Sequence, residues 1–178
     1  VAVCLLHSYL NPEHERRVGE MVREYMPDTF LSLSVDILPE VREYERTSTT
    51  VINSYVGPII ERYLRSLDKR LTNSGIKAPL RVMQSNGGVM SARRACVLPA
   101  YMVESGPAAG VIAAQRLAER LGIGNLITFD MGGTTAKASV IEDGMPGRTT
   151  EYEVGSGITL SSRLVKGSGH ALKLPVID

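Results

Sequence analysis

The stretch LITFDMGGTTAKASVIE, residues 126–142, contains two apolar runs separated by a short glycine-rich loop. We predict strands at residues 125–129 and 136–141, because apolar and β-branched residues predominate in both runs. The loop between them, residues 130–135, begins with an aspartate at the end of the first strand. Strand and helix patterns alternate in the preceding residues, which favours an α/β fold with a mixed sheet and flanking helices.

The loop has the residue types of a phosphate-binding loop. Gly132 and Gly133 lack side chains, so consecutive backbone N–H groups can turn toward an anion. Thr134 and Thr135 can donate further hydrogen bonds, and the Asp130 carboxylate can hold Mg²⁺ or a metal-bound water. A glycine hairpin whose aspartate bonds only its own turn explains the same residues equally well. No GxxxxGK[ST] pattern occurs, so this is not a Walker loop.

A second glycine motif lies between two short predicted strands. Asn86, Gly87 and Gly88 follow the run at residues 80–84 and have the composition of a tight turn. The asparagine side chain and the glycine amides could contact a ligand. A hairpin without any binding role is the more common use of such a sequence.

A third motif stands at the predicted start of a helix that ends at Gly122. Glu104, Ser105 and Gly106 begin this helix, and the small residues would let an anion approach its positive end. Tight packing against a sheet would explain them as well. Glu104 could serve as an acid or base, or could cap the helix.

The rest of the chain is predicted from its apolar periodicity. We expect a buried strand at residues 1–8, a helix beginning near Pro12, a strand at residues 30–37 and a long helix at residues 48–73. The expected buried stripe of the long helix has a spacing of four: Val51, Tyr55, Ile59, Tyr63, Leu67 and Leu71. Val56, Ile60 and Leu64 widen this face. The expected buried stripe of the helix that ends at Gly122 is Val111, Ala114, Leu117, Ala118 and Leu121.

Composition narrows the classes of function. The net charge of +1 over 178 residues and the absence of a basic block argue against nucleic acid or a membrane surface as a partner. The two cysteines form no CxxC pair, so a zinc site or disulfide framework is not expected and a cytoplasmic location fits best. Both ends of the chain are apolar and strand-like, from which we expect a segment of a larger protein.

Four ordered stretches resemble the hydantoinase A / 5-oxoprolinase family. They are LLHSYLNPEHE at residues 5–15, EYERTSTTVINSYV at 43–56, MQSNGG at 83–88, and ESGPAAG at 104–110 leading to FDMGGTT at 129–135. The resemblance departs from the family after the loop, where members often have an aspartate and this chain has Lys137. Lys137 could contact a phosphate or mark a subfamily with different metal handling.

The resemblance implies a fold similar to that of sugar kinases, Hsp70 and actin, which hold ATP between two ribonuclease-H-like lobes. Residues 1–122 would be the α/β portion of a hydantoinase A-type domain, and residues 123–178 would start the second lobe. The implied enzyme uses ATP and Mg²⁺ to activate a cyclic amide carbonyl for ring opening, with a hydantoinase B-type subunit or domain as partner. The isolated segment is expected to be inactive, because it holds only one wall of the cleft.

Three alternatives remain open from the residues and the resemblance. ATP-dependent ketone carboxylase subunits share this architecture, so the resemblance does not determine the substrate. An actin-like ATP-binding module that changes partners without ring chemistry is a further possibility, as is a purely structural α/β domain whose glycine loops are only turns.

Overall fold

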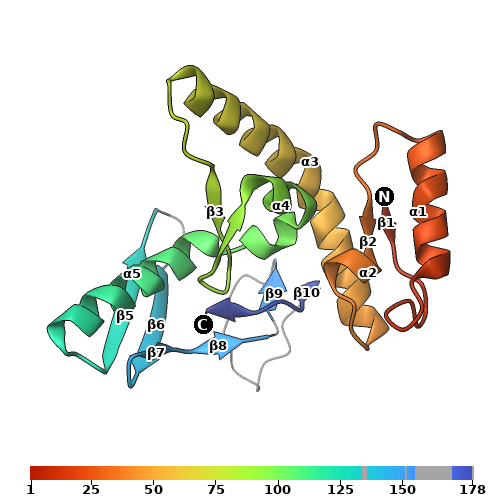
Figure 1. Cartoon of the computed structure of the whole chain (residues 1–178). Coiled ribbons are helices and arrows are strands. Elements are labelled where there is room, and N and C mark those ends of the chain that lie inside the picture. Colours follow the sequence, from red (N-terminus) through yellow and green to blue (C-terminus); the bar gives the residue numbers. More distant parts are fainter. Residues whose placement is uncertain (134–135, 151, 155–169, 178) are drawn as a thin grey trace.

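The computed structural model describes residues 1–133, 136–150, 152–154 and 170–177. A long helix, α3 (Glu43–Asn73), crosses the centre of the molecule (Figure 1). The N-terminal strands and helices lie on one side of α3, and a short hairpin with a small helix lies on the other (Figure 1). The segment that carries the candidate phosphate loop comes later in the chain. It packs on another long helix, α5 (Ser105–Leu121).

The N-terminal unit is organised around a buried glutamate. Strand β1 (Ala2–Val3) pairs in parallel with β2 (Ser32–Leu33), and α1 (Glu13–Tyr25) leads from one to the other. The predicted strand at 30–37 is wrong in its second half, which is the short helix α2 (Ser34–Ile37). Glu15 explains the difference, because its carboxylate accepts hydrogen bonds from Val35 N and Ser34 Oγ, each at 3.0 Å. An acceptor at that position satisfies the first turn of a helix.

The predicted strand at residues 1–8 is also shorter than expected. After β1 the chain turns at residues 6–10, and His7 adopts a left-handed backbone with φ 55°. Helix α1 then begins at Glu13, as predicted, with the Glu13 amide bonded to Asn11 Oδ1 at 3.1 Å.

The predicted buried stripe of α3 is wrong in its central part, although Leu64 at its edge is buried as expected. Tyr55, Ile59 and Tyr63 are 79%, 66% and 58% exposed. The buried face is largely polar and comprises Arg46, Thr49, Thr50, Asn53, Gly57 and Leu64. The difference arises because the segments against this face present backbone groups that need polar partners. Hydrophobic spacing alone does not report such partners.

Asn53 is the centre of that polar face. Its amide nitrogen donates to Ser32 Oγ at 2.9 Å and to the Val97 carbonyl at 3.1 Å. Its carbonyl oxygen accepts from the Ala100 amide at 3.1 Å. Thr49 adds a fourth link, because its hydroxyl accepts from the Lys173 amide at 3.0 Å. One face of α3 therefore joins segments that are far apart in the sequence.

The hairpin predicted around the turn at residues 84–88 forms as expected. Strand β3 (Arg81–Met83) pairs antiparallel with β4 (Val89–Ser91), followed by α4 (Ala92–Val97) and the 3₁₀ helix η1 (Pro99–Met102). Their apolar side chains pack on the distal half of α3 in a cluster of Leu64, Val82, Met90 and Ala95.

Helix α5 covers one side of the last described sheet. It begins at Ser105 and ends before the left-handed Gly122, as predicted. Strands β5 (Leu126–Met131), β6 (Ala136–Glu142) and β7 (Met145–Pro146) follow as an antiparallel meander. Ala108, Val111, Ile141 and Ile177 form the core between helix and strands. The predicted stripe of α5 is wrong at Leu117 and Leu121, which are 60% and 64% exposed, because the sheet contacts only the face through Val111 and Ala118.

The remaining strands are short and pair with C-terminal residues. Strand β8 (Arg148–Thr149) pairs with β11 (Val176–Ile177), and β9 (Tyr152–Val154) pairs with β10 (His170–Leu172). The α/β class is thus confirmed, but the described strands form five small sheets in place of one mixed sheet, and only β1 and β2 are parallel. Most of these strands are only two or three residues long, which limits each sheet to a few backbone hydrogen bonds. Among the described residues, no helix is long and apolar enough to cross a membrane.

Substituting Asn53 tests the polar face of α3. We expect Asn53→Ala to lower the free energy of unfolding by about 2–4 kcal/mol, because three hydrogen bonds are lost, and the partner groups of Ser32 and Ala100 stay buried. Tyr55→Ala on the exposed face is the matched control, and its effect should stay within about 0.5 kcal/mol. Urea denaturation measures both. Equal effects of the two substitutions would contradict the assigned role.

The Glu15 carboxylate gives a pH-dependent prediction. Burial alone raises its pKa, but hydrogen bonds from Leu5, Ser8, Val35 and Ser34 together outweigh burial, and the pKa is lowered. A depressed carboxyl pKa contributes stability above the unfolded value of about 4.3, and this stability is lost as the pH falls through the folded pKa. Wild type should therefore exceed Glu15→Gln in unfolding free energy by about 2 kcal/mol at neutral pH.

The difference between wild type and Glu15→Gln should shrink as the pH is lowered below about 4. Denaturation curves of both proteins over this range provide the measurement. A difference that does not change with pH would show that the charge of Glu15 is not what stabilises α2.

Candidate functional site

The candidate loop stands at the free end of the β5–β6 hairpin. The last two register pairs are Asp130 with Lys137 and Met131 with Ala136. Asp130 is exposed at this end, and the exposed Gly132 and Gly133 follow directly. The two predicted threonine donors, residues 134 and 135, lie outside the described residues. The hairpin therefore presents a carboxylate and a glycine pair to solvent at one point.

The two glycines are not explained by the fold around them. Beyond its chain neighbours, a Cβ atom built on Gly132 or Gly133 would meet no atom of the described residues within 4 Å. Neither residue adopts the left-handed backbone that favours glycine. Internal packing and turn geometry thus leave both positions open to larger residues. The open space above the loop gives a ligand free approach to the backbone.

An ion pair connects the hairpin to the start of α5. The Lys137 ammonium contacts the Glu104 carboxylate, and the two side chains are 32% and 31% exposed. Glu104 immediately precedes α5 and has a left-handed backbone with φ 62°, which is uncommon for a residue with a side chain. Such strain of about 1–3 kcal/mol often occurs at functional sites. The pair places the predicted residues Ser105 and Gly106 near the beginning of β6.

This ion pair was not anticipated from the sequence. Glu104 and Lys137 are 33 residues apart. The sequence suggested separate roles for them: an acid, base or helix cap for Glu104, and a phosphate contact for Lys137. Only the opposite charges of the two residues could have suggested the pair. The family resemblance gives no guide, because its members often have an aspartate where this chain has Lys137. In the structure the Lys137 charge is partly neutralised, so it is held beside the loop by a partner and is not an isolated cation.

The second predicted motif, the glycine turn at residues 84–88, lies elsewhere. The turn at residues 84–88 packs against α5 and β11, where a Cβ on Gly87 would come within 2.7 Å of Ile177 Cδ1 and 2.8 Å of Ile112 Cδ1. Asn86 Oδ1 accepts the Gly88 amide at 2.8 Å, so its side chain closes the turn. The close packing explains the left-handed Gly87, with φ 81°. The structure thus gives Asn86, Gly87 and Gly88 a structural position and does not bring them to the Asp130 loop.

One face of the β5–β6 hairpin is apolar and exposed. The apolar run at 125–129 predicts a buried strand, which is wrong for this face, where Ile127 and Phe129 are 72% and 68% exposed. Met131, the next residue on the same face, is 70% exposed. The alternation of a strand explains the pattern, because α5 packs on the opposite face only.

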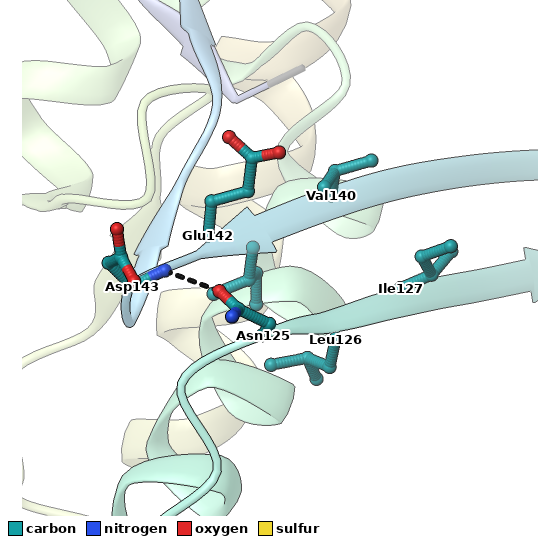
Figure 2. Close-up of a pocket in the computed structure, with 7 residues that line it drawn as sticks. Asn125, Leu126, Ile127, Val140, Glu142 and Asp143 are labelled. Atoms are coloured by element: carbon teal, nitrogen blue, oxygen red, sulfur yellow. Dashed lines mark hydrogen bonds between the residues drawn. The ribbon is translucent and has the colours of Figure 1, made fainter.

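A surface hollow lies at the other end of the same hairpin. Figure 2 shows Asn125 and Asp143 joined by a hydrogen bond from Asp143 N to Asn125 Oδ1 at 2.8 Å. The hollow has a volume of about 650 Å³, and residues 125–127 and 140–143 line it. It is four register pairs, roughly 14 Å, from Asp130. Its charged groups, Glu142 and Asp143, would repel phosphate, so we do not assign it to the loop.

The carboxylate of Asp130 is the predicted metal ligand. Within the described residues, no group of three or more histidine, cysteine, aspartate or glutamate side chains could hold a metal ion. A single carboxylate is nevertheless sufficient for Mg²⁺ when phosphate oxygens and water complete its shell. The residues present therefore fit a nucleotide-bound magnesium ion and not a dedicated protein metal centre.

The chain is similar to several known proteins. An uncharacterized protein of Methanocaldococcus jannaschii is 46% identical over 178 residues, which cover all of this chain and 26% of that protein. The caprolactamase subunit alpha of Pseudomonas jessenii is 38% identical over 144 residues, or 81% of this chain and 21% of the relative. The chain thus spans about a quarter or less of the length of these relatives.

Two solved structures share its fold. The nucleotide-free structure of acetone carboxylase, described as ATP-dependent, aligns with a TM-score of 0.79 and 31% identity over 98% of this chain and 23% of that one. The ATP-dependent caprolactamase of Pseudomonas jessenii aligns with a TM-score of 0.72 and 32% identity over 100% of this chain and 24% of that one.

The family model described as Hydantoinase/oxoprolinase matches residues 46–178, about three quarters of the chain. This range includes the long helix α3 from Arg46 onward, the η1–α5 junction and the Asp130 loop. The chain therefore belongs to the hydantoinase/oxoprolinase family.

Proposed function

We propose that the protein carrying this chain is an ATP-dependent enzyme that activates a cyclic amide carbonyl for ring-opening hydrolysis. In this proposal the loop from Asp130 to Thr135 binds the nucleotide phosphates, and Asp130 faces Mg²⁺. Solved relatives described as ATP-dependent support the use of ATP. ATP would supply a phosphoryl group that turns the carbonyl oxygen of an unreactive lactam into a good leaving group.

The observation that carries this proposal is the pair of glycines without a structural reason. Gly132 and Gly133 have open space above them and an ordinary backbone. Bare amide groups at such a position can approach phosphate oxygens closely, which any side chain would prevent. Asp130 is separated from this glycine pair only by Met131. Its carboxylate would supply the charge that a magnesium ion requires.

Three other groups would complete the phosphate environment. The start of α5 brings the positive end of a 17-residue helix to the same side of the hairpin, through the contact of Glu104 with Lys137. Lys137 is the cation nearest the loop along β6 and would stabilise phosphate charge. Glu104 would hold Lys137 in place and limit the excess positive charge when no nucleotide is bound.

The larger architecture is part of the proposal. The meander β5–β6–β7 consists of consecutive antiparallel strands with a helix on one face. We propose that it begins a ribonuclease-H-like lobe in residues 123–178, and that residues 1–122 form the preceding α/β portion. The exposed apolar face of β5 would then be covered by other parts of that lobe. A hydantoinase B-type subunit is the proposed partner, since related proteins are described as subunits.

A ketone carboxylase is the second candidate, and one observation favours it. The acetone carboxylase structure aligns with the higher TM-score of the two solved relatives, 0.79 against 0.72. Both reactions would use the same phosphate loop. ATP hydrolysis by the full-length protein with its partner distinguishes them, because a cyclic amide should stimulate a hydrolase and a ketone with bicarbonate should stimulate a carboxylase.

Substituting the loop residues tests the phosphate site in the full-length protein. Asp130→Asn should reduce ATP turnover by about 100-fold or more, because it removes a metal-facing charge while keeping the side-chain volume. Asp143→Asn is the matched control, since Asp143 is exposed at the far end of the hairpin and asparagine accepts its left-handed backbone. Steady-state ATPase assays decide the matter, and an Asp130→Asn enzyme with wild-type turnover would show the loop to be only a turn.

The glycine pair provides a separate steric test. Gly133→Val should abolish nucleotide binding without loss of stability, because its Cβ meets no described atom within 4 Å while the side chain fills the space above the backbone. Gly110→Val on α5 is its control, as that position is equally open. Nucleotide titration and thermal unfolding of both variants make the measurement. Retained ATP binding by Gly133→Val would contradict the proposed approach of phosphate to the loop.

A further inference from the structure

Arg46 is a buried cation whose charge no described residue neutralises. It lies in the first turn of α3 and is 1% exposed. Its Nη2 donates to the Leu5 carbonyl at 2.5 Å, whereas Nε and Nη1 are buried without any hydrogen-bond partner. In the described part of the chain no carboxylate forms an ion pair with it. Buried guanidinium groups are normally paired, so this arrangement requires an explanation.

The buried carboxylate of the same unit does not provide the counter-charge. The Glu15 oxygens already accept from Leu5 N, Ser34 Oγ and Val35 N, each at 3.0 Å. Leu5 separates the two charged groups, since its amide bonds Glu15 and its carbonyl bonds Arg46. The same carbonyl also accepts from Ser8 Oγ at 3.0 Å. Glu15 thus serves the start of α2, and the three N–H groups on Nε and Nη1 of Arg46 have no acceptor.

A surface loop covers the guanidinium. The Tyr9 ring lies over Arg46, with 5.4 Å between Cζ and the ring centroid, which gives a cation–π contact but no negative charge. The Tyr9 hydroxyl lies 3.4 Å from Nδ1 of His7, which is exposed and has a left-handed backbone. Leu10 in the same loop is 74% exposed. On this side of Arg46, the turn at residues 6–10 lies between the guanidinium and solvent.

We infer that Arg46 binds a small planar carboxylate-type anion, taken from solution, beneath the Tyr9 loop. A guanidinium presents planar N–H donors that match the oxygens of a carboxylate or bicarbonate better than a spherical ion. The first turn of α3 has no side-chain cap, and the positive end of this 31-residue helix favours an anion, against the opposing charges of Glu43 and Glu45 in the same turn. Arg46 is only 1% exposed, so the anion must be as small as formate or bicarbonate.

This site is independent of the proposed phosphate loop. It lies at the start of α3 beside the turn between β1 and α1, whereas the Asp130 loop lies on the hairpin that packs on α5 (Figure 1). It also uses two of the motifs noted in the sequence, residues 5–15 and 43–56, to which the phosphate loop gives no role. Loss of ATP binding would leave this inference untouched, and the reverse also holds.

Anion titration of the full-length protein is the first test. Isothermal calorimetry should show one site for formate and for bicarbonate, and both should raise the unfolding temperature relative to chloride at equal ionic strength. Arg46→Lys should weaken formate binding by about tenfold or more, because lysine lacks the planar donor set. Arg65→Lys is the matched control, since Arg65 lies on the same helix, is exposed and pairs with Glu61; it should bind formate as the wild type does.

Hydrogen exchange of the wild-type protein decides the question even where Arg46→Lys fails to fold. Formate should slow exchange in residues 5–11 and 43–50, and leave residues 13–25 of α1 unchanged. The inference is overturned by wild-type protein that responds equally to formate and chloride. It is likewise overturned by formate binding that survives in Arg46→Lys, or by a full-length structure in which a carboxylate side chain already pairs with Arg46.

Discussion

The polar face of α3 is the constraint on which the other elements depend. Buried amide and hydroxyl groups must find partners, and each partner fixes the position of a separate segment. Asn53 joins the strand that carries Ser32, the end of α4 at Val97 and the start of η1 at Ala100. An apolar face would tolerate small shifts of these segments, whereas directional hydrogen bonds do not.

The polar face of α3 also positions the candidate site, through a short series of contacts. The 3₁₀ helix η1 is held by α3 through the Ala100 amide. It is also held by Ser85, in the turn between β3 and β4, whose hydroxyl donates to the Tyr101 carbonyl. Glu104 lies between η1 and α5, and its left-handed backbone turns the chain into α5. Its carboxylate holds Lys137 on β6. The loop that begins at Asp130 is thus positioned relative to the centre of the molecule, although it is itself exposed.

Local features of the sequence were sufficient to predict elements but not their buried faces. The glycine at position 122, the turn at 84–88 and the β5–β6 hairpin have strong local signals, and all three form as expected. The apolar stripe through Tyr55 was placed on the wrong side, because a buried face made of threonine and asparagine has no hydrophobic period. Contacts between distant residues, such as Lys137 with Glu104, depend on packing that no local pattern contains.

The central claim is that the exposed glycine pair after β5 binds nucleotide phosphate. A structure of the full-length protein with Mg²⁺ and a non-hydrolysable ATP analogue tests this most directly. We expect phosphate oxygens at about 3 Å from the backbone nitrogens of Gly132 and Gly133, with the metal ion facing Asp130. A nucleotide bound elsewhere, with this loop unoccupied, would contradict the account.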